Sequence, residues 1–81
     1  MELNELKLLL DVNTIISKSE LIFKYITPEF ISNNSTQNIV SFIGEVRDKK
    51  VSCVKNQMFT EAATFRDIEI HITLLLKSNQ K

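Results

Sequence analysis

Gly44 and Pro28 are the only glycine and proline among 81 residues, and this scarcity constrains the fold more than any other feature. Tight turns between strands depend on these residue types, so the composition disfavours a sheet protein with many turns. It leaves room for long, uninterrupted helices. A chain of this length forms one small domain that buries only about 60–65% of its unfolded surface, so a partner or a second copy would add stability.

The charge pattern and the single cysteine narrow the functional classes. Ten basic and ten acidic residues give a net charge of zero, and nucleic-acid binding is therefore not expected as the main role. Cys53 has no cysteine to pair with, which favours a reducing compartment. No signal-peptide pattern occurs, and no apolar run approaches the roughly 20 residues of a membrane helix. We expect a soluble, cytoplasmic protein without membrane association.

Apolar periodicity predicts helices in the N-terminal half. The first segment has its leucines on one face of a helix over about residues 2–12: Leu3, Leu6, Leu9 and Leu10. A second apolar segment, entered at Asn13 or Thr14, again has helical spacing. A strand stays open at residues 21–26, where β-branched and aromatic residues gather. Thr27 and Pro28 then predict a new helix start, because threonine caps helices and proline fits the first turn.

The polar stretch at residues 32–38 predicts a loop between an N-terminal helical segment, residues 1–34, and a C-terminal hairpin, residues 38–78. Apolar residues recurring every three or four positions predict a helix from about Thr36 to Gln57.

Two positions inside this predicted helix carry expectations of their own. Gly44 costs about 1 kcal/mol relative to alanine, and we interpret it as a close helix contact. Glu45 and Lys49 have the favourable i,i+4 order for an ion pair.

Residues 62–76 carry two conflicting periods. The segment from Ile68 to Leu74 alternates like a strand, but the helix-forming residues before it run on without a break, which favours a helix. On that helix one broad apolar stripe holds Ala62, Phe65, Ile68, Ile72, Leu75 and Leu76. A second, roughly opposite stripe holds Ala63, Ile70 and Leu74. A helix with two stripes has two packing partners, namely its hairpin mate and either the N-terminal half, a second copy or another protein.

The stretch "VKNQMFTEAATFRDIE", residues 54–69, resembles the UVR motif. The shared pattern comprises Asn56, Gln57, Phe59, Ala62, Ala63, Phe65, Arg66, Asp67 and Glu69. The motif is a short helical hairpin of excinuclease B and C subunits, arginine-kinase activators and the middle region of Clp-type AAA+ unfoldases. The resemblance implies that Phe59 fills the closed end of the hairpin and that Ala62 allows the helices to approach. Met58 replaces the family's usual acidic residue, so we expect Thr60 to cap the second helix.

The residues that perform chemistry in those families are absent from this sequence. There is no phosphate-binding loop and no CxxC zinc pair. Cys53 and His71 are the only cysteine and histidine, and their positions relative to the predicted turn put them at different levels of the hairpin. Cys53 is expected in the core and His71 on a solvated strip. We therefore predict no enzyme, no cofactor and no metal site.

The predicted fold is an all-α domain with a C-terminal antiparallel hairpin that either pairs into a four-helix bundle or captures a partner's helix. The predicted function is a non-catalytic protein–protein interaction module, an adaptor or regulator. The resemblance implies a Clp-type ATPase or an excinuclease subunit as its partner, with homo-oligomerisation also expected. The predicted contact residues are Met58, Phe59, Ala63, Arg66, Ile70 and Leu74.

Three alternatives remain open at this point. The protein could be a homodimeric structural protein without a foreign partner. It could be a weak nucleic-acid accessory protein with a basic face of Arg47, Lys49, Lys50, Lys55 and Arg66. It could also be an inhibitor that mimics the Clp middle hairpin.

Overall fold

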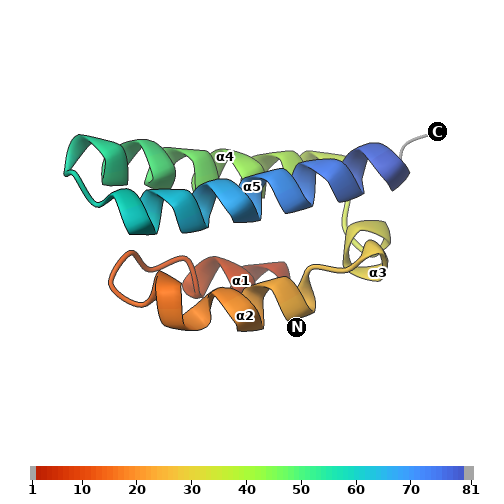
Figure 1. The fold of residues 1–81 in the computed structure, drawn as a ribbon. Helices are drawn as coiled ribbons and strands as arrows, with labels where there is room; N and C mark the ends of the chain where they lie inside the picture. The colour runs from red at the N-terminus through yellow and green to blue at the C-terminus, as the bar shows by residue number, and fades with distance from the viewer. Residues whose placement is uncertain (1, 80–81) are drawn as a thin grey trace.

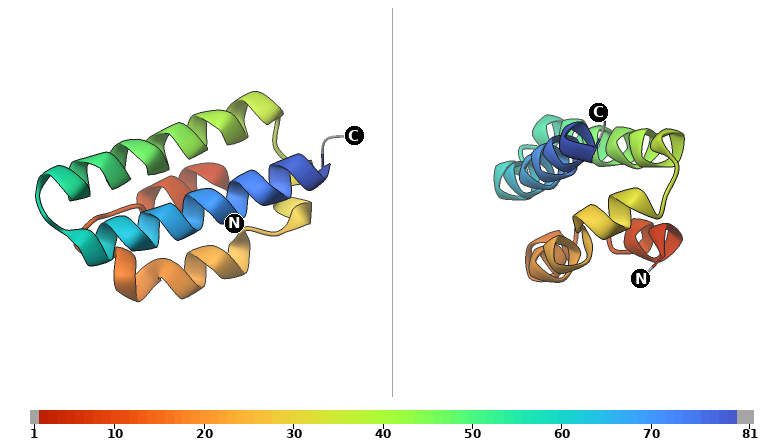
Figure 2. Two further views of the ribbon diagram at one scale, coloured as in Figure 1. Left: turned by 45° about the horizontal axis from the view of Figure 1, so that its top comes forward. Right: turned by 90° about the vertical axis from the view of Figure 1, so that its right-hand side faces the viewer.

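Two layers of helices make up the computed structural model, which describes residues 2–79. It contains no strand within that range and confirms the all-α prediction. The helices are α1 (Leu3–Leu8), α2 (Ile15–Tyr25), α3 (Pro28–Ser32), α4 (Thr36–Lys55) and α5 (Phe59–Asn79). The long α4–α5 hairpin forms one layer, and α1 and α2 lie beneath it with α3 at one end (Figure 1). The end-on view of Figure 2 shows α1 beneath α4 and α2 beneath α5.

The first helix is shorter than the predicted 2–12 because a turn interrupts it. The Asn13 N–H donates to Asp11 Oδ1 at 3.0 Å, and the Thr14 N–H donates to the Asp11 carbonyl at 3.0 Å. An aspartate that bonds the backbone two residues on competes with helical hydrogen bonding. Leu6 and Leu10 nevertheless point into the core, as the leucine spacing predicted.

The short helix α3 begins as the sequence predicted, with Pro28 in its first turn. Thr27 Oγ1 accepts the Phe30 N–H at 3.1 Å, which satisfies one of the donors that a helix start leaves unpaired. Ser35 caps α4 in the same way, accepting the Asn38 N–H at 3.2 Å. Residues 21–25 belong to α2, so the strand alternative is wrong.

The hairpin turn corrects two predictions. Gln57 adopts a left-handed φ of 60°. The Met58 N–H donates to the Cys53 carbonyl at 2.8 Å, and the Gln57 N–H donates to the Val54 carbonyl at 3.1 Å. These two bonds are the Schellman arrangement, in which the residue after the left-handed position packs back on the helix. Met58 therefore packs against the core and Phe59, expected there, is 63% exposed. Because α5 already begins at Phe59, Thr60 lies inside the helix and not at its cap.

One face of α5 serves both of its neighbours. Its buried residues are those of the predicted broad stripe: Ala62, Phe65, Ile68 and Ile72. This stripe packs against α4 within the hairpin and against α2 and α3 of the N-terminal half. The helices α1 and α2 thus cover this side of the hairpin (Figure 2).

Polar contacts join the two layers at their edges. His71 Nε2 donates to the Ile26 carbonyl at 3.0 Å, and its ring meets Phe23 edge to face at a centroid distance of 5.3 Å. His71 is half-buried, so the prediction that it is solvated is wrong. Glu45 forms its ion pair with Lys7 of α1 at 3.4 Å instead of the expected pair with Lys49.

Candidate protein-docking surface

The second predicted stripe of α5 lies on the side of the hairpin that faces away from α1 and α2. Phe59, Ala63, Arg66, Ile70 and Leu74 follow one another at intervals of four, three, four and four residues, so they share one side of the helix. Ile70 is 48% exposed and Leu74 is 59% exposed. Five of the six predicted contact residues therefore lie together, and the sixth, Met58, is turned towards the core.

A matching stripe on α4 was not predicted. It consists of Val40, Gly44, Arg47, Val51 and Val54, at intervals of four, three, four and three residues. The three valines are exposed, whereas the opposite side of α4 is buried. The spacing was visible in the sequence, but the stronger periodicity of the buried side masked it. We refer to the α4 and α5 stripes together as the outer face.

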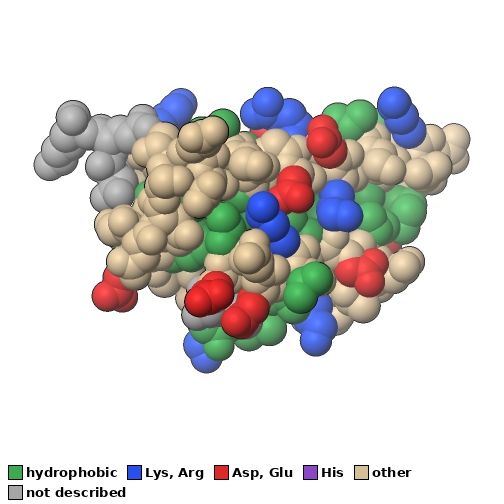
Figure 3. Space-filling model, turned by 180° about the vertical axis from the view of Figure 1, so that it is seen from behind, with side chains coloured by type: hydrophobic (Ala, Val, Ile, Leu, Met, Phe, Trp, Pro, Cys, Tyr) green, Lys and Arg blue, Asp and Glu red, His purple; other side chains and the backbone are tan. Residues whose placement is uncertain are grey.

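The outer face concentrates apolar surface. Eight large hydrophobic side chains are exposed among the described residues, and six of them belong to the two stripes; Leu8 and Ile16 are the others. On the side of the molecule seen in Figure 3, by contrast, hydrophobic side chains reach the surface only in separate areas with charged side chains between them. The outer face is thus the main unpartnered apolar surface among residues 2–79.

A groove of about 290 Å³ runs between the two stripes. Its lining combines cations, a carboxylate and apolar side chains: Arg47, Lys50, Arg66, Glu69, Ile70, Thr73 and Leu74. The carboxylate of Glu69 bonds Lys50 Nζ at 2.7 Å and Arg47 Nε at 3.0 Å, which ties α4 to α5.

Glu69 lies at the edge of the buried side of α5, and this double ion pair compensates its charge there. Its side chain is only 13% exposed. The hydrogen bond from Lys50 holds the pKa of the Glu69 carboxyl below its ordinary value, even though desolvation acts in the opposite direction; the bond from Arg47 adds to the effect. The carboxylate therefore stays ionised at neutral pH.

Gly44 is the one position of the α4 stripe that carries no side chain. A Cβ built on this residue would meet no atom within 4 Å, so the predicted close contact does not exist inside the chain. Gly44 lies three residues before Arg47 on the α4 stripe. Packing within the described chain therefore gives no reason for a glycine here.

The predicted basic face does not gather as a free cationic patch. Arg47 and Lys50 are bound by Glu69, and Arg66 lies 3.5 Å from Asp67. This geometry weakens the case for a polyanion, because phosphate binding depends on uncompensated cations.

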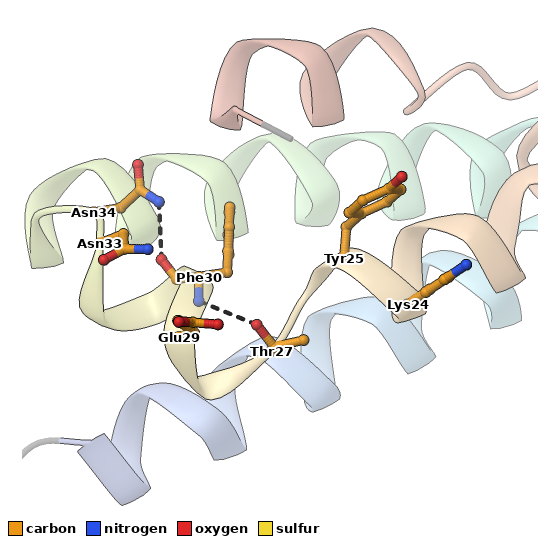
Figure 4. Close-up of a pocket in the computed structure, with 7 residues that line it drawn as sticks. All are labelled: Lys24, Tyr25, Thr27, Glu29, Phe30, Asn33 and Asn34. Atoms are coloured by element: carbon orange, nitrogen blue, oxygen red, sulfur yellow. Dashed lines mark hydrogen bonds between the residues drawn. The ribbon is translucent and has the colours of Figure 1, made fainter.

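A second hollow, at the junction of α2 and α3, is explained by local structure. Its lining residues, drawn in Figure 4, are Lys24, Tyr25, Thr27, Glu29, Phe30, Asn33 and Asn34. Thr27 caps α3, and Asn34 Nδ2 donates to the Phe30 carbonyl at 2.9 Å. These polar groups close a short helix and leave no convergent set of side chains for a ligand.

The reactive residue types are likewise placed in structural roles. Cys53 is buried, and this burial, with the charge of Glu61, raises the pKa of its thiol, so that it stays protonated and unreactive. His71, the only histidine, bonds the Ile26 carbonyl. Within residues 2–79 no group of three or more His, Cys, Asp or Glu side chains could hold a metal ion. No helix in the same range is long and apolar enough to cross a membrane.

Comparison with family models, with curated proteins and with solved structures found no match to this chain. The resemblance to the UVR motif therefore remains a hypothesis that depends on the residues of the hairpin.

Proposed function

We propose that this protein is a non-catalytic interaction module that binds another protein through the outer face. The observation that supports it most is the division of α5 into two sides. One side is buried against α4, α2 and α3, while the other exposes Ile70 and Leu74 beside a groove. Clustered exposed apolar residues on a small protein mark interaction sites. The UVR resemblance supports a Clp-type ATPase or an excinuclease subunit as the partner, in a cytoplasmic setting.

A second copy of the chain is the other candidate partner. Both stripes have intervals of three and four residues, as in helices that pack against one another in coiled coils and bundles, so the outer face also fits a second hairpin. Light scattering over a range of concentrations separates the two. A mass that rises to the dimer supports self-association, and a constant monomer mass supports a foreign partner.

The test compares baits in extracts of the cells that make the protein. One bait is the native chain, a second carries Ile70→Asp and Leu74→Asp, and a matched control carries Leu8→Asp and Ile16→Asp on the other layer. Central apolar contacts dominate interface energies, so the outer-face variant should lose a captured partner by at least about tenfold. The control should retain it. Equal capture by the native chain and the outer-face variant contradicts the proposal.

A further inference from the structure

We infer that the groove of the outer face binds an acidic amphipathic helix of the partner protein. The inference rests on the proposed function and adds the chemistry of the partner. It follows from the apolar ridge, the charge and the shape of the groove.

The apolar ridge sets the kind of element. Ile70 and Leu74, four residues apart on α5, line one wall of the groove. Arg47 and Lys50, on the neighbouring helix α4, line the other wall. A groove between two antiparallel helices accepts a third helix along its length, with apolar anchors every three or four residues. Gly44, three residues before Arg47 on the same stripe, leaves open space where any other residue would carry a Cβ, so a partner backbone can approach this part of the outer face closely.

The charge of the groove lining indicates which residues the partner helix carries. Arg47, Lys50 and Arg66 line the groove with one carboxylate, Glu69, and Asp67 lies 3.5 Å from Arg66, so the three cations exceed the two nearby carboxylates by one. Both oxygens of Glu69 are already engaged, and the side chains of Arg47 and Arg66 are each 60% exposed. A guanidinium can bond further carboxylate oxygens through its remaining N–H groups. Carboxylates flanking the apolar anchors would complete this arrangement, whereas lysines there would be repelled.

The test uses two labelled helical peptides and the full chain. Both have leucines at i, i+3, i+4 and i+7; one has glutamate at the flanking positions and the other has lysine at each of them. Fluorescence anisotropy should show the glutamate peptide binding about tenfold more tightly, with the difference shrinking as salt is added.

Two variants of equal net charge locate the effect. Arg47→Gln with Arg66→Gln should weaken the glutamate peptide at least about threefold, whereas Lys18→Gln with Lys24→Gln, on the opposite layer, should stay within about twofold. Lys50 remains as a partner for Glu69 in the first variant, and thermal melts of both should show a folded chain.

The outcomes separate the inference from the proposed function. Preference for the glutamate peptide that depends on Arg47 and Arg66 supports the inference. Equal binding of both peptides, or no binding of either, overturns it. Those results leave the proposed function to its own test, the loss of a captured partner in the Ile70 and Leu74 variant.

Discussion

Replacing Gly44 with alanine should stabilise the protein. In the middle of α4, glycine costs about 1 kcal/mol relative to alanine, because it loses more backbone freedom on folding. The added methyl group meets no atom within 4 Å, so no steric term opposes the gain. The expected increase in the free energy of unfolding is therefore about 1 kcal/mol, which corresponds to about 4–8 °C in Tm for a domain of this size.

Urea denaturation followed by circular dichroism measures this change. The midpoint should rise while the slope with denaturant stays the same, since the surface exposed on unfolding does not change. Ser41→Gly, at an exposed position one turn earlier on α4, is the converse control and should lower stability by about 0.5 kcal/mol. A Gly44→Ala protein less stable than the native chain would refute the reasoning, because it would show that the methyl group meets packed atoms.

Three further substitutions test the turn, the ion pair and a cap. Gln57→Gly should stabilise by about 0.5–1 kcal/mol, because glycine adopts the left-handed φ of 60° without steric cost. Glu69→Gln should destabilise by about 1–2 kcal/mol at neutral pH, because Lys50 loses its charged acceptor. Since the pKa of Glu69 is lowered on folding, the stability that its ionised carboxylate contributes is fully present above the ordinary pKa of 4.5 and is lost as the pH falls through the lowered pKa. The stability difference between the native chain and the Glu69→Gln variant should therefore shrink in acid. Thr27→Ala should cost about 1 kcal/mol, because the Phe30 N–H loses its acceptor.

Each of these three substitutions has a matched control variant, whose stability is measured by the same denaturation experiment. Gln57→Ala removes the same side chain without relieving the backbone, so a gain as large as that of glycine would refute the turn argument. Glu20→Gln, on an exposed turn of α2, should show little change at any pH, and an equal loss there would assign the effect to net charge. Thr36→Ala, at an exposed position in the first turn of α4, should cost less than the Thr27 variant; an equal cost would contradict the capping role.

The helices could be predicted from the sequence because the spacing of apolar residues and the capping residues indicated the same elements. Thr27 with Pro28 predicted the start of α3, and the 62–76 pattern predicted a helix despite its local alternation. The length of α1 was overestimated because leucine spacing does not report that the Asp11 side chain accepts a hydrogen bond from the Asn13 N–H. Phe59 was expected to fill the closed end of the hairpin, but Met58 packs there because Gln57, a non-glycine residue, adopts the left-handed conformation.

The candidate site could be predicted only in part. The exposed stripe of α5 followed from its period alone. The stripe on α4 was masked by the stronger period of its buried side, and its position beside the α5 stripe, like the bridging role of Glu69, depends on the register of the hairpin, which pairs residues 22 positions apart. His71 was expected in solvent because its own helix face is polar, and only the position of α2 supplies the Ile26 carbonyl that it binds.

Site-specific photo-crosslinking tests the proposed docking surface most directly. A photoreactive amino acid replaces Ile70 in one chain and Ile16, exposed on α2, in another, and each is irradiated in extract of the native cells. We predict a discrete crosslinked product from position 70 that is absent from position 16. A product from position 16 without one from position 70 would contradict the assignment of the outer face as the docking surface.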